Sequence, residues 1–218
     1  MTMNEQQAAR VGILGAAGRM GRTLVQAVAA SEGRVTLGAA FEHAASADLG
    51  ADASTLAGLP ASGVAVQATL NADTFDVLID FTRPEALAGA LSACRQRRRG
   101  LVIGTTGYSA DQRAAIEQAA TEIPICMSGN FSVGIFLLQR LVEQAASMLG
   151  GEFDIEVVEA HHRHKVDAPS GTALMLGEAA ARGAGRSLAD DAVYAREGHT
   201  GPRAAGTIGF STIRGGDV

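Results

Sequence analysis

The sequence predicts an α/β protein in which a doubly wound parallel sheet is followed by a smaller α+β domain. Through the first 130 residues, short apolar runs alternate with helix-length amphipathic segments, the order that builds parallel sheets from βαβ units. A glycine-rich turn joins the first apolar run to the first amphipathic segment. Beyond residue 130 the alternation stops and a long apolar helix begins. We therefore expect two domains, residues 1–130 and residues 131–218.

The first domain should contain six strands and three main helices. The expected strands are short apolar runs: Val11–Gly15, Val35–Phe41, Val64–Gln67, Val77–Phe81, Leu101–Gly104 and Ile123–Met127. The expected helices lie near Arg19–Ala30, Pro84–Arg98 and Ala110–Thr121. Thr82-Arg-Pro-Glu85 and Ser109-Ala-Asp-Gln112 have the pattern of capping boxes, which predicts that the second and third helices begin there.

The second domain has a different order of elements. We expect a helix at Phe131–Leu149, a strand at Phe153–Glu159, a polar loop and a helix at Gly171–Ala181. A Gly-rich tail follows, and the chain stops at Arg214–Val218 inside what looks like a strand.

The composition limits the classes of partner. Of the 218 residues 47% are apolar and 19% charged, which is ordinary for a globular protein. The net charge of -5 gives no electrostatic reason to bind nucleic acid or an anionic membrane surface. No apolar run approaches the ~20 residues that span a bilayer, and residues 1–10 lack the pattern of a signal peptide. We expect a cytoplasmic protein with neither partner.

The two cysteines are expected to be reduced thiols in the core. Cys94 lies in a helix-like segment and Cys126 in a segment typical of a buried strand, with no CxxC spacing. Aromatic residues make up only 4% of the chain, so the core around them should be mainly aliphatic.

The turn after the first strand is a candidate phosphate site. Val11-Gly-Ile-Leu-Gly15-Ala-Ala-Gly18-Arg-Met-Gly21 leads from a strand through three glycines into a helix. Such a turn lets the backbone approach a pyrophosphate, which the N–H groups at the helix start bind. The spacing is GxxGxxG because Ala17 takes the place of a middle glycine, so a merely structural turn stays an alternative. The turn indicates a Rossmann-like domain.

An acidic residue after the second strand supports a dinucleotide. Glu42 lies 27 residues beyond Gly15 and can accept hydrogen bonds from the adenosine ribose hydroxyls. The spacing is somewhat longer than the ~20 residues of the usual motif. A solvated surface glutamate is the alternative.

The remaining strand ends carry small or polar residues: Asp80-Phe-Thr82, Gly104-Thr-Thr-Gly107 and Ser128-Gly-Asn-Phe131. In a doubly wound sheet these ends open onto one crevice, where ligands bind. Gly104, Thr105 and Thr106 would let the backbone approach a nicotinamide closely. Each segment could instead be only a well-capped turn. Together they favour NADH or NADPH as cofactor.

The segment from Glu159 to Ala173 carries the strongest chemical signal. His161, His162, Arg163, His164 and Lys165 stand directly before a Pro169-Ser-Gly-Thr172 helix start. A helix start with a Thr hydroxyl binds one carboxylate, while Lys165 and an imidazole bind or polarise another. This pattern predicts a small dicarboxylate as substrate.

Three alternatives compete with that interpretation. His161, His162, His164 and Asp167 could hold zinc, but adjacent histidines are unusual zinc ligands and no Cys joins them. A structural polar loop rarely gathers so many histidines. A basic loop for nucleic acid conflicts with the acidic chain. We therefore expect no metal.

Along essentially its whole length the sequence resembles the dihydrodipicolinate reductase family. The segment Glu159–Ala173 matches the family signature. The other matching blocks follow in the family's order: Gly15-Ala-Ala-Gly-Arg-Met-Gly21, Asp80-Phe-Thr-Arg-Pro-Glu85, Gly104-Thr-Thr-Gly107, Asn130-Phe-Ser-Val-Gly134 and Arg196-Glu-Gly-His-Thr-Gly201.

The resemblance implies hydride transfer from NADH or NADPH to C4 of a cyclic dicarboxylate, in diaminopimelate and lysine biosynthesis. It implies that His161 donates the proton, that Lys165 is a second donor or an electrostatic stabiliser, and that His162, Gly171 and Thr172 hold substrate carboxylates. An imidazole suits proton donation near neutral pH. The expected cofactor residues are Gly15, Ala16, Ala17, Gly18, Arg19, Met20, Glu42, His43, Phe81, Arg83, Gly104, Thr105, Thr106, Ser128, Gly129, Asn130 and Phe131. Residues 1–130 would bind the dinucleotide, and residues 131–218 would bind substrate and build a homotetramer through their sheet.

The sequence departs from the family in two places. Many relatives carry Arg where this chain has His43, and that Arg grips the 2′-phosphate of NADPH, so the phosphate preference stays open. Family members also continue beyond the position of Val218, so we expect a segment to be missing. Another nicotinamide reductase for a small dicarboxylate, a nucleotide-sensing Rossmann protein and a metal-dependent hydrolase remain alternatives. The histidine segment argues against a sensor, which needs no proton donor.

Overall fold

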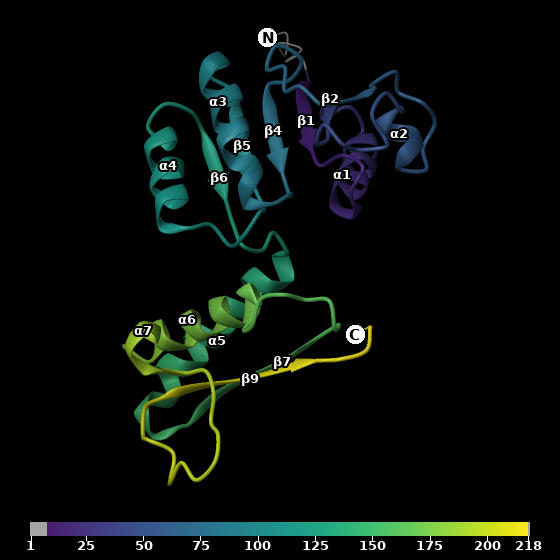
Figure 1. The fold of residues 1–218 in the computed structure, drawn as a ribbon. Coiled ribbons are helices and arrows are strands. Elements are labelled where there is room, and N and C mark those ends of the chain that lie inside the picture. The colour runs from purple at the N-terminus through teal and green to yellow at the C-terminus, as the bar shows by residue number, and fades with distance from the viewer. Residues whose placement is uncertain (1–7, 218) are drawn as a thin grey trace. The chain divides into compact units, whose positions relative to one another are not determined.

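The computed structural model describes residues 8–217, which form two compact units (Figure 1). The first unit is Met1–Ser128 and the second is Gly129–Val218. Residues 1–7, the greater part of the segment examined for a signal peptide, and Val218 lie outside the described residues.

The first unit is built on a parallel sheet, as predicted. Its described strands form one sheet in the order β3-β2-β1-β4-β5-β6, and every pair is parallel. The order reverses between β1 and β4, the switch point at which such sheets bind ligands. The strands are β1 (Ala9–Leu14), β2 (Val35–Phe41), β3 (Val66–Gln67), β4 (Val77–Asp80), β5 (Gly100–Ile103) and β6 (Ile125–Met127).

Helices cover both faces of this sheet. One apolar cluster joins α1 (Arg19–Ala29) and the short α2 (Ala53–Leu56), which the sequence did not predict, to one face. A second cluster joins α3 (Leu87–Arg97) and α4 (Ala110–Ala120) to the other face. The parallel strands and the helices on both faces thus give the doubly wound arrangement that the apolar pattern predicted.

One predicted capping box is confirmed and the other is wrong. Ser109 accepts from the backbone of Gln112 while the Gln112 side chain accepts from Ser109, so α4 begins where expected. Thr82 caps no helix, because its hydroxyl donates instead to the buried carboxyl of Asp80 at 2.6 Å. A 3-10 turn, Pro84–Ala86, follows and α3 begins only at Leu87.

The two cysteines differ. Cys94 is fully buried in α3, and burial raises the pKa of its thiol to about 12, so it is the inert core thiol that was predicted. The prediction that Cys126 is buried is wrong, since Cys126 is exposed. It lies in β6, the edge strand of the sheet, where the neighbouring Met127 is exposed as well.

The second unit combines helices with a small sheet. Its elements are α5 (Val133–Leu149), the 3-10 turn Gly150–Glu152, β7 (Ile155–His161), α6 (Gly171–Gly183), α7 (Leu188–Asp191), β8 (Ala192–Val193) and β9 (Ile208–Arg214). The described strands are ordered β7-β9-β8 and pair in parallel. The main helices and β7 were predicted, whereas α7 and β8 lie in a tail without an apolar pattern.

The two faces of this small sheet are unlike. Ile155 and Val157 of β7 and Ile208 and Phe210 of β9 form a core with Ala173 of α6. On the opposite face, Val158 is 67% exposed and Ile213 is 55% exposed. Among the described residues, no helix is both long and apolar enough to cross a membrane.

Gly21 should be essential to the packing of α1 on the glycine turn. A Cβ atom at this position would lie 2.1 Å from the carbonyl oxygen of Gly15 and 2.6 Å from Cα of Ala16. Because both are backbone atoms, Gly21→Ala must displace the turn. We expect the free energy of unfolding to fall by ~1–3 kcal/mol or more. Urea unfolding followed by circular dichroism measures the loss.

Gly89→Ala is the matched control, since Gly89 also lies in a helix of the first unit and a Cβ there would come no closer than 3.8 Å to Leu70 Cδ1. We expect its urea midpoint to be unchanged or slightly higher. Equal midpoints for the two variants would contradict the close packing.

Candidate active site

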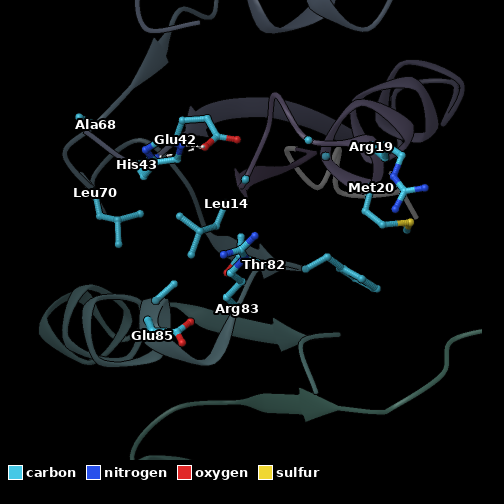
Figure 2. Close-up of a pocket in the computed structure, with 15 residues that line it drawn as sticks. Leu14, Arg19, Met20, Glu42, His43, Ala68, Leu70, Thr82, Arg83 and Glu85 are labelled. Atoms are coloured by element: carbon cyan, nitrogen blue, oxygen red, sulfur yellow. Dashed lines mark hydrogen bonds and ion pairs between the residues drawn. The ribbon is translucent and has the colours of Figure 1, made fainter. Parts of the chain in front are cut away.

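A cleft of about 1060 Å³ lies at the carboxyl ends of the strands in the first unit (Figure 2). It is bordered by the glycine turn after β1, by the end of β2 and by the segment after β4. The lining residues are Leu14, Gly15, Gly18, Arg19, Met20, Gly21, Glu42, His43, Ala68, Leu70, Phe81, Thr82, Arg83, Glu85 and Ala86. The cleft therefore occupies the switch point between β1 and β4.

The glycine turn has the form needed to hold a phosphate. Gly15 adopts φ +74°, and its N–H and that of Ala16 donate to the carbonyl of Phe41 at 2.8 and 3.0 Å. A side chain on Gly15 would also meet the methyl of Thr82 at 2.6 Å. No side chain caps the N-terminus of α1, where Gly18 is the N-cap. Its first N–H groups are thus available to an anion in the cleft.

Glu42 joins the end of β2 to this turn. Its Oε1 accepts from the N–H of Ala17 at 3.2 Å and its Oε2 from the N–H of His43 at 3.1 Å. The Glu42 side chain is 12% exposed and that of His43 is 71% exposed, and Figure 2 shows the two side by side at the cleft. These two hydrogen bonds hold the Glu42 carboxylate at the place in the cleft where the ribose of a dinucleotide would lie.

The structure brings many of the expected cofactor residues together. Those that line the cleft are Gly15, Gly18, Arg19, Met20, Glu42, His43, Phe81 and Arg83. Ala16, within the turn, is buried, and the N–H of Ala17 donates to Glu42. The expected residues Gly104, Thr105, Thr106, Ser128, Gly129, Asn130 and Phe131 do not line it.

The end of β5 nevertheless adjoins the cleft through β4. Thr105 is buried, and its hydroxyl donates to Asp80 Oδ1 at 3.0 Å and accepts from the N–H of Thr82 at 2.8 Å. Gly104 packs so closely on Phe81 that a Cβ would lie 2.2 Å from the ring. Asp80 thus fixes the two strand ends in one position, while Thr106 is exposed.

Several lining residues were not among the expected cofactor residues: Leu14, Gly21, Ala68, Leu70, Thr82, Glu85 and Ala86. Gly21 and Thr82 lie in segments that the sequence predicted to bind a ligand. Ala68 and Leu70 follow β3, so the rule that strand ends meet at one crevice would have found them. From the sequence, that rule was applied to residues 80–82, 104–107 and 128–131, and not to the end of the third strand.

The histidine segment of the second unit connects the end of β7 to the start of α6. His161 is the last residue of β7, and Ser170 caps α6 by accepting from the N–H of Ala173 at 3.1 Å. Lys165 pairs with Asp167 at 2.6 Å. His162 Nδ1 accepts from the N–H of His164 at 3.2 Å. At Gly171 a Cβ would meet nothing within 4 Å, so space lies open above the helix start.

Thr172 and Asn130 are in contact, since the amide of Asn130 donates to the Thr172 hydroxyl at 3.1 Å. Asn130 also accepts from the N–H of Ser132 at 2.7 Å, just before α5. The start of α6 is thereby joined to the start of the unit. Within residues 8–217, no three His, Cys, Asp or Glu side chains lie where they could hold a metal ion together.

Glu159 is at the centre of this region. Its two carboxylate oxygens accept from the Arg214 guanidinium at 2.9 and 3.0 Å, and Oε1 also accepts from the N–H of Ser170 at 3.1 Å. His161 Nδ1 is hydrogen-bonded to Oε2. The Arg214 guanidinium, helped by Ser170 and His161, holds the pKa of Glu159 at about 2. Neither Glu159 nor Arg214 was predicted from the sequence as a site residue.

Comparison with known families decides what these two units are. Residues 9–131 match the family model described as dihydrodipicolinate reductase, N-terminus, and residues 134–218 match dihydrodipicolinate reductase, C-terminus. The chain belongs to the dihydrodipicolinate reductase family. The resemblance drawn from the sequence motifs is thereby confirmed.

Solved structures agree with this assignment. A dipicolinate-bound dihydrodipicolinate reductase from Paenisporosarcina sp. TG-14 is 27% identical, with a TM-score of 0.64 over 95% of this chain and 79% of that one. Aspartate semialdehyde dehydrogenase II from Vibrio cholerae is 13% identical, with a TM-score of 0.53 over 95% of this chain and 68% of that one. The WlbA dehydrogenase from Bordetella pertussis is 15% identical, with a TM-score of 0.52 over 76% and 46%. The last two show the fold alone.

As a dihydrodipicolinate reductase, the protein is an NAD(P)H-dependent oxidoreductase of diaminopimelate and lysine biosynthesis. It reduces dihydrodipicolinate to tetrahydrodipicolinate with NADH or NADPH. No observation favours another nicotinamide reductase or a nucleotide sensor.

The Glu159 carboxylate should make the stability of the protein depend on pH. Its pKa of about 2 is below the ordinary value of 4.5, so its ion pair stabilises the fold above pH 4.5, and this stabilisation is lost as pH falls from 4.5 toward 2. We expect Glu159→Gln to cost ~1–3 kcal/mol at pH 6. At pH 3 the cost should be clearly smaller, because Glu159 of the unfolded chain, with its ordinary pKa of 4.5, is already protonated there while the native carboxylate is still mostly ionised. Urea unfolding of both proteins at the two pH values measures the difference, and an equal cost at both would contradict the ion pair.

Proposed function

We propose that the histidine segment of the second unit is the site of substrate protonation and of carboxylate binding. The observation that carries this proposal is that Glu159 ties the end of β7, where His161 lies, to the start of α6, where Gly171 and Thr172 lie. A proton donor and a carboxylate-binding helix start are thereby held next to each other.

Each side chain then has a distinct task. His161, whose side chain is 35% exposed, gives its proton to the substrate. Lys165 stabilises the negative charge of the dicarboxylate, in competition with its present partner Asp167. His162, the N–H groups near Gly171 and the Thr172 hydroxyl bind the substrate carboxylates. The similar enzyme from Paenisporosarcina is a dipicolinate complex, and dipicolinate is a planar ring dicarboxylate of the kind that this set of donors suits.

The first unit fits a nicotinamide dinucleotide. Its cleft of about 1060 Å³, the uncapped start of α1 and the fixed carboxylate of Glu42 are the features that pyrophosphate and ribose require. Arg19 and Arg83 line the same cleft and are exposed. When bound, the reduced nicotinamide supplies the hydride. We assign residues 1–130 to the dinucleotide, with Gly104–Thr106 on the nicotinamide side. We expect Ser128, Gly129, Asn130 and Phe131 to contact the cofactor as well.

We further propose that residues 131–218 bind the substrate and form a homotetramer in the cytoplasm. The open face of the small sheet supports the tetramer, since Val158 and Ile213 are largely exposed there. Apolar residues on an uncovered sheet face are typical of a surface that another subunit covers.

His161→Gln tests the proton donor. Loss of a general acid should lower turnover by ~10²–10⁴-fold while leaving the affinity for NADH nearly unchanged. His164→Gln is the matched control, because His164 belongs to the same loop and its side chain is exposed. Steady-state kinetics followed by the absorbance of NADH, with substrate made freshly from pyruvate and aspartate semialdehyde, give the turnover and, from KM, the apparent affinity for NADH. Turnover of the His161 variant within threefold of the native enzyme would remove it from this role.

Cofactor choice should follow from Glu42 and His43. The Glu42 carboxylate repels a 2′-phosphate, and an imidazole is mostly neutral at pH 8, whereas an Arg would remain charged and bind phosphate in bidentate fashion. We expect NADH to be used at least as well as NADPH. His43→Arg should shift the preference toward NADPH by ~1–2 kcal/mol, with His43→Gln as the neutral control.

The measurement is kcat/KM for both cofactors at pH 8. A tenfold or greater preference for NADPH in the native enzyme would contradict the prediction and would direct attention to Arg19 and Arg83, the guanidinium groups that border the cleft.

A further inference from the structure

We propose that Glu159 is a positioning residue that keeps the Nδ1 proton of His161 in place, so that Nε2 is the atom from which the substrate receives its proton. This inference rests on the proposed role of His161 as proton donor. It adds a residue that touches neither substrate nor cofactor and acts through the imidazole.

The direction of the hydrogen bond follows from the charge of Glu159. With its pKa held at about 2, the carboxylate is ionised throughout the neutral range, and an ionised carboxylate can only accept hydrogen bonds. The bond between His161 Nδ1 and Glu159 Oε2 therefore requires that Nδ1 carries the proton. The neutral ring is then fixed as the Nδ1–H tautomer, with its lone pair on Nε2.

Arg214 keeps Glu159 in the ionised, correctly oriented form. Its two terminal nitrogens donate to the two carboxylate oxygens, at 3.0 Å to Oε2 and 2.9 Å to Oε1. Its Nη2 also donates to the carbonyl of Asp167 at 2.5 Å. The Glu159 side chain is 10% exposed and Arg214 19% exposed, so water competes little for these bonds. A planar, bidentate pair of this kind fixes orientation as well as charge.

The same carboxylate reaches the carboxylate-binding helix. Glu159 Oε1 accepts the N–H of Ser170, the residue that caps α6. One rigid group thus sets the position of both the imidazole and the helix start. A shift of either relative to the other would need one of these bonds to break.

The proton step begins at Nε2 of the imidazolium, whose N–H bond breaks while its electron pair remains on Nε2. A bound reduced nicotinamide would supply a hydride, whose electron pair forms the new C–H bond and breaks a π bond of the substrate. The electron pair of that π bond accepts the proton from Nε2, so hydride and proton together add the elements of H2. The ring returns to the neutral form with its Nδ1 proton still held by Glu159.

The direct test is the tautomer of His161 in the full-length enzyme. The protein is labelled with ¹⁵N-histidine, and its ring nitrogens are observed by long-range proton–nitrogen NMR at alkaline pH, with His161 identified by the loss of its signals in His161→Gln. We expect the neutral ring to carry its proton on Nδ1. A proton on Nε2 would overturn the proposal, and this result needs no variant of Glu159 to fold.

Glu159→Gln and Glu159→Asp provide the functional test. In the Glu159→Gln variant the side-chain amide nitrogen would face an N–H of Arg214 in either orientation of the amide, because Arg214 donates to both oxygens of the native carboxylate. We expect the Nε2–H tautomer to increase and kcat to fall by between ~10-fold and ~10⁴-fold, the upper limit being the cost of a wrong tautomer in Ser-His-Asp enzymes. KM for the substrate should change less than kcat. Glu159→Asp keeps the charge and should recover part of kcat.

Glu156→Gln is the matched control. Glu156 lies on the same strand and also pairs with an arginine through both oxygens, at 3.1 and 2.8 Å from Arg196. It pairs with Arg203 as well, at 3.1 Å, and its partners among the described residues include no histidine. We expect the tautomer of His161 to be unchanged and kcat to stay within threefold. If Glu159→Gln leaves both the tautomer and kcat unchanged, the proposal is wrong. Native turnover in His161→Gln would instead contradict the proton-donor role, while the tautomer measurement would still decide the role of Glu159.

Discussion

A parallel sheet places the carboxyl ends of all its strands at one edge, and this constraint governs the first unit. Because β1 lies between β2 and β4, the connections leave this edge in opposite directions and cannot close the space between them. The cleft forms there, and the ends of three strands supply its chemistry. The glycine turn provides backbone N–H groups, β2 provides Glu42, and the segment after β4 provides Arg83.

The second unit depends instead on one ionised carboxylate, that of Glu159. Glu159 accepts hydrogen bonds from β9 through Arg214, from the start of α6 through Ser170 and from His161 at the end of its own strand. The parallel pairing of β7 with β9 sets His161 opposite Arg214, which is why the guanidinium can reach this carboxylate. Glu159 thereby holds both ends of the charged loop between β7 and α6, and the proposed reaction leaves its carboxylate unchanged.

Where the sequence interpretation failed, a tertiary contact had overridden a local pattern. Thr82 has the sequence of a cap, but the buried carboxyl of Asp80 competes for its hydroxyl and its N–H. Cys126 has the neighbours of a buried strand, yet β6 forms the edge of the sheet. Edge position is a property of strand order, which local hydrophobicity does not encode.

The sequence by itself determined the fold class, the glycine turn, the position of Glu42 after β2 and the family to which the histidine segment belongs. These features depend on residues near one another in the chain, where periodicity, turn chemistry and spacing apply directly. Only the tertiary structure decided that Glu159 and Arg214, which are 55 residues apart, form the pair beside His161. It also decided that Ala68 and Leu70 border the cleft. Contacts of this kind arise from the order and register of strands. Strand pairing brings distant segments together, and the local sequence of neither segment shows which partner it will have.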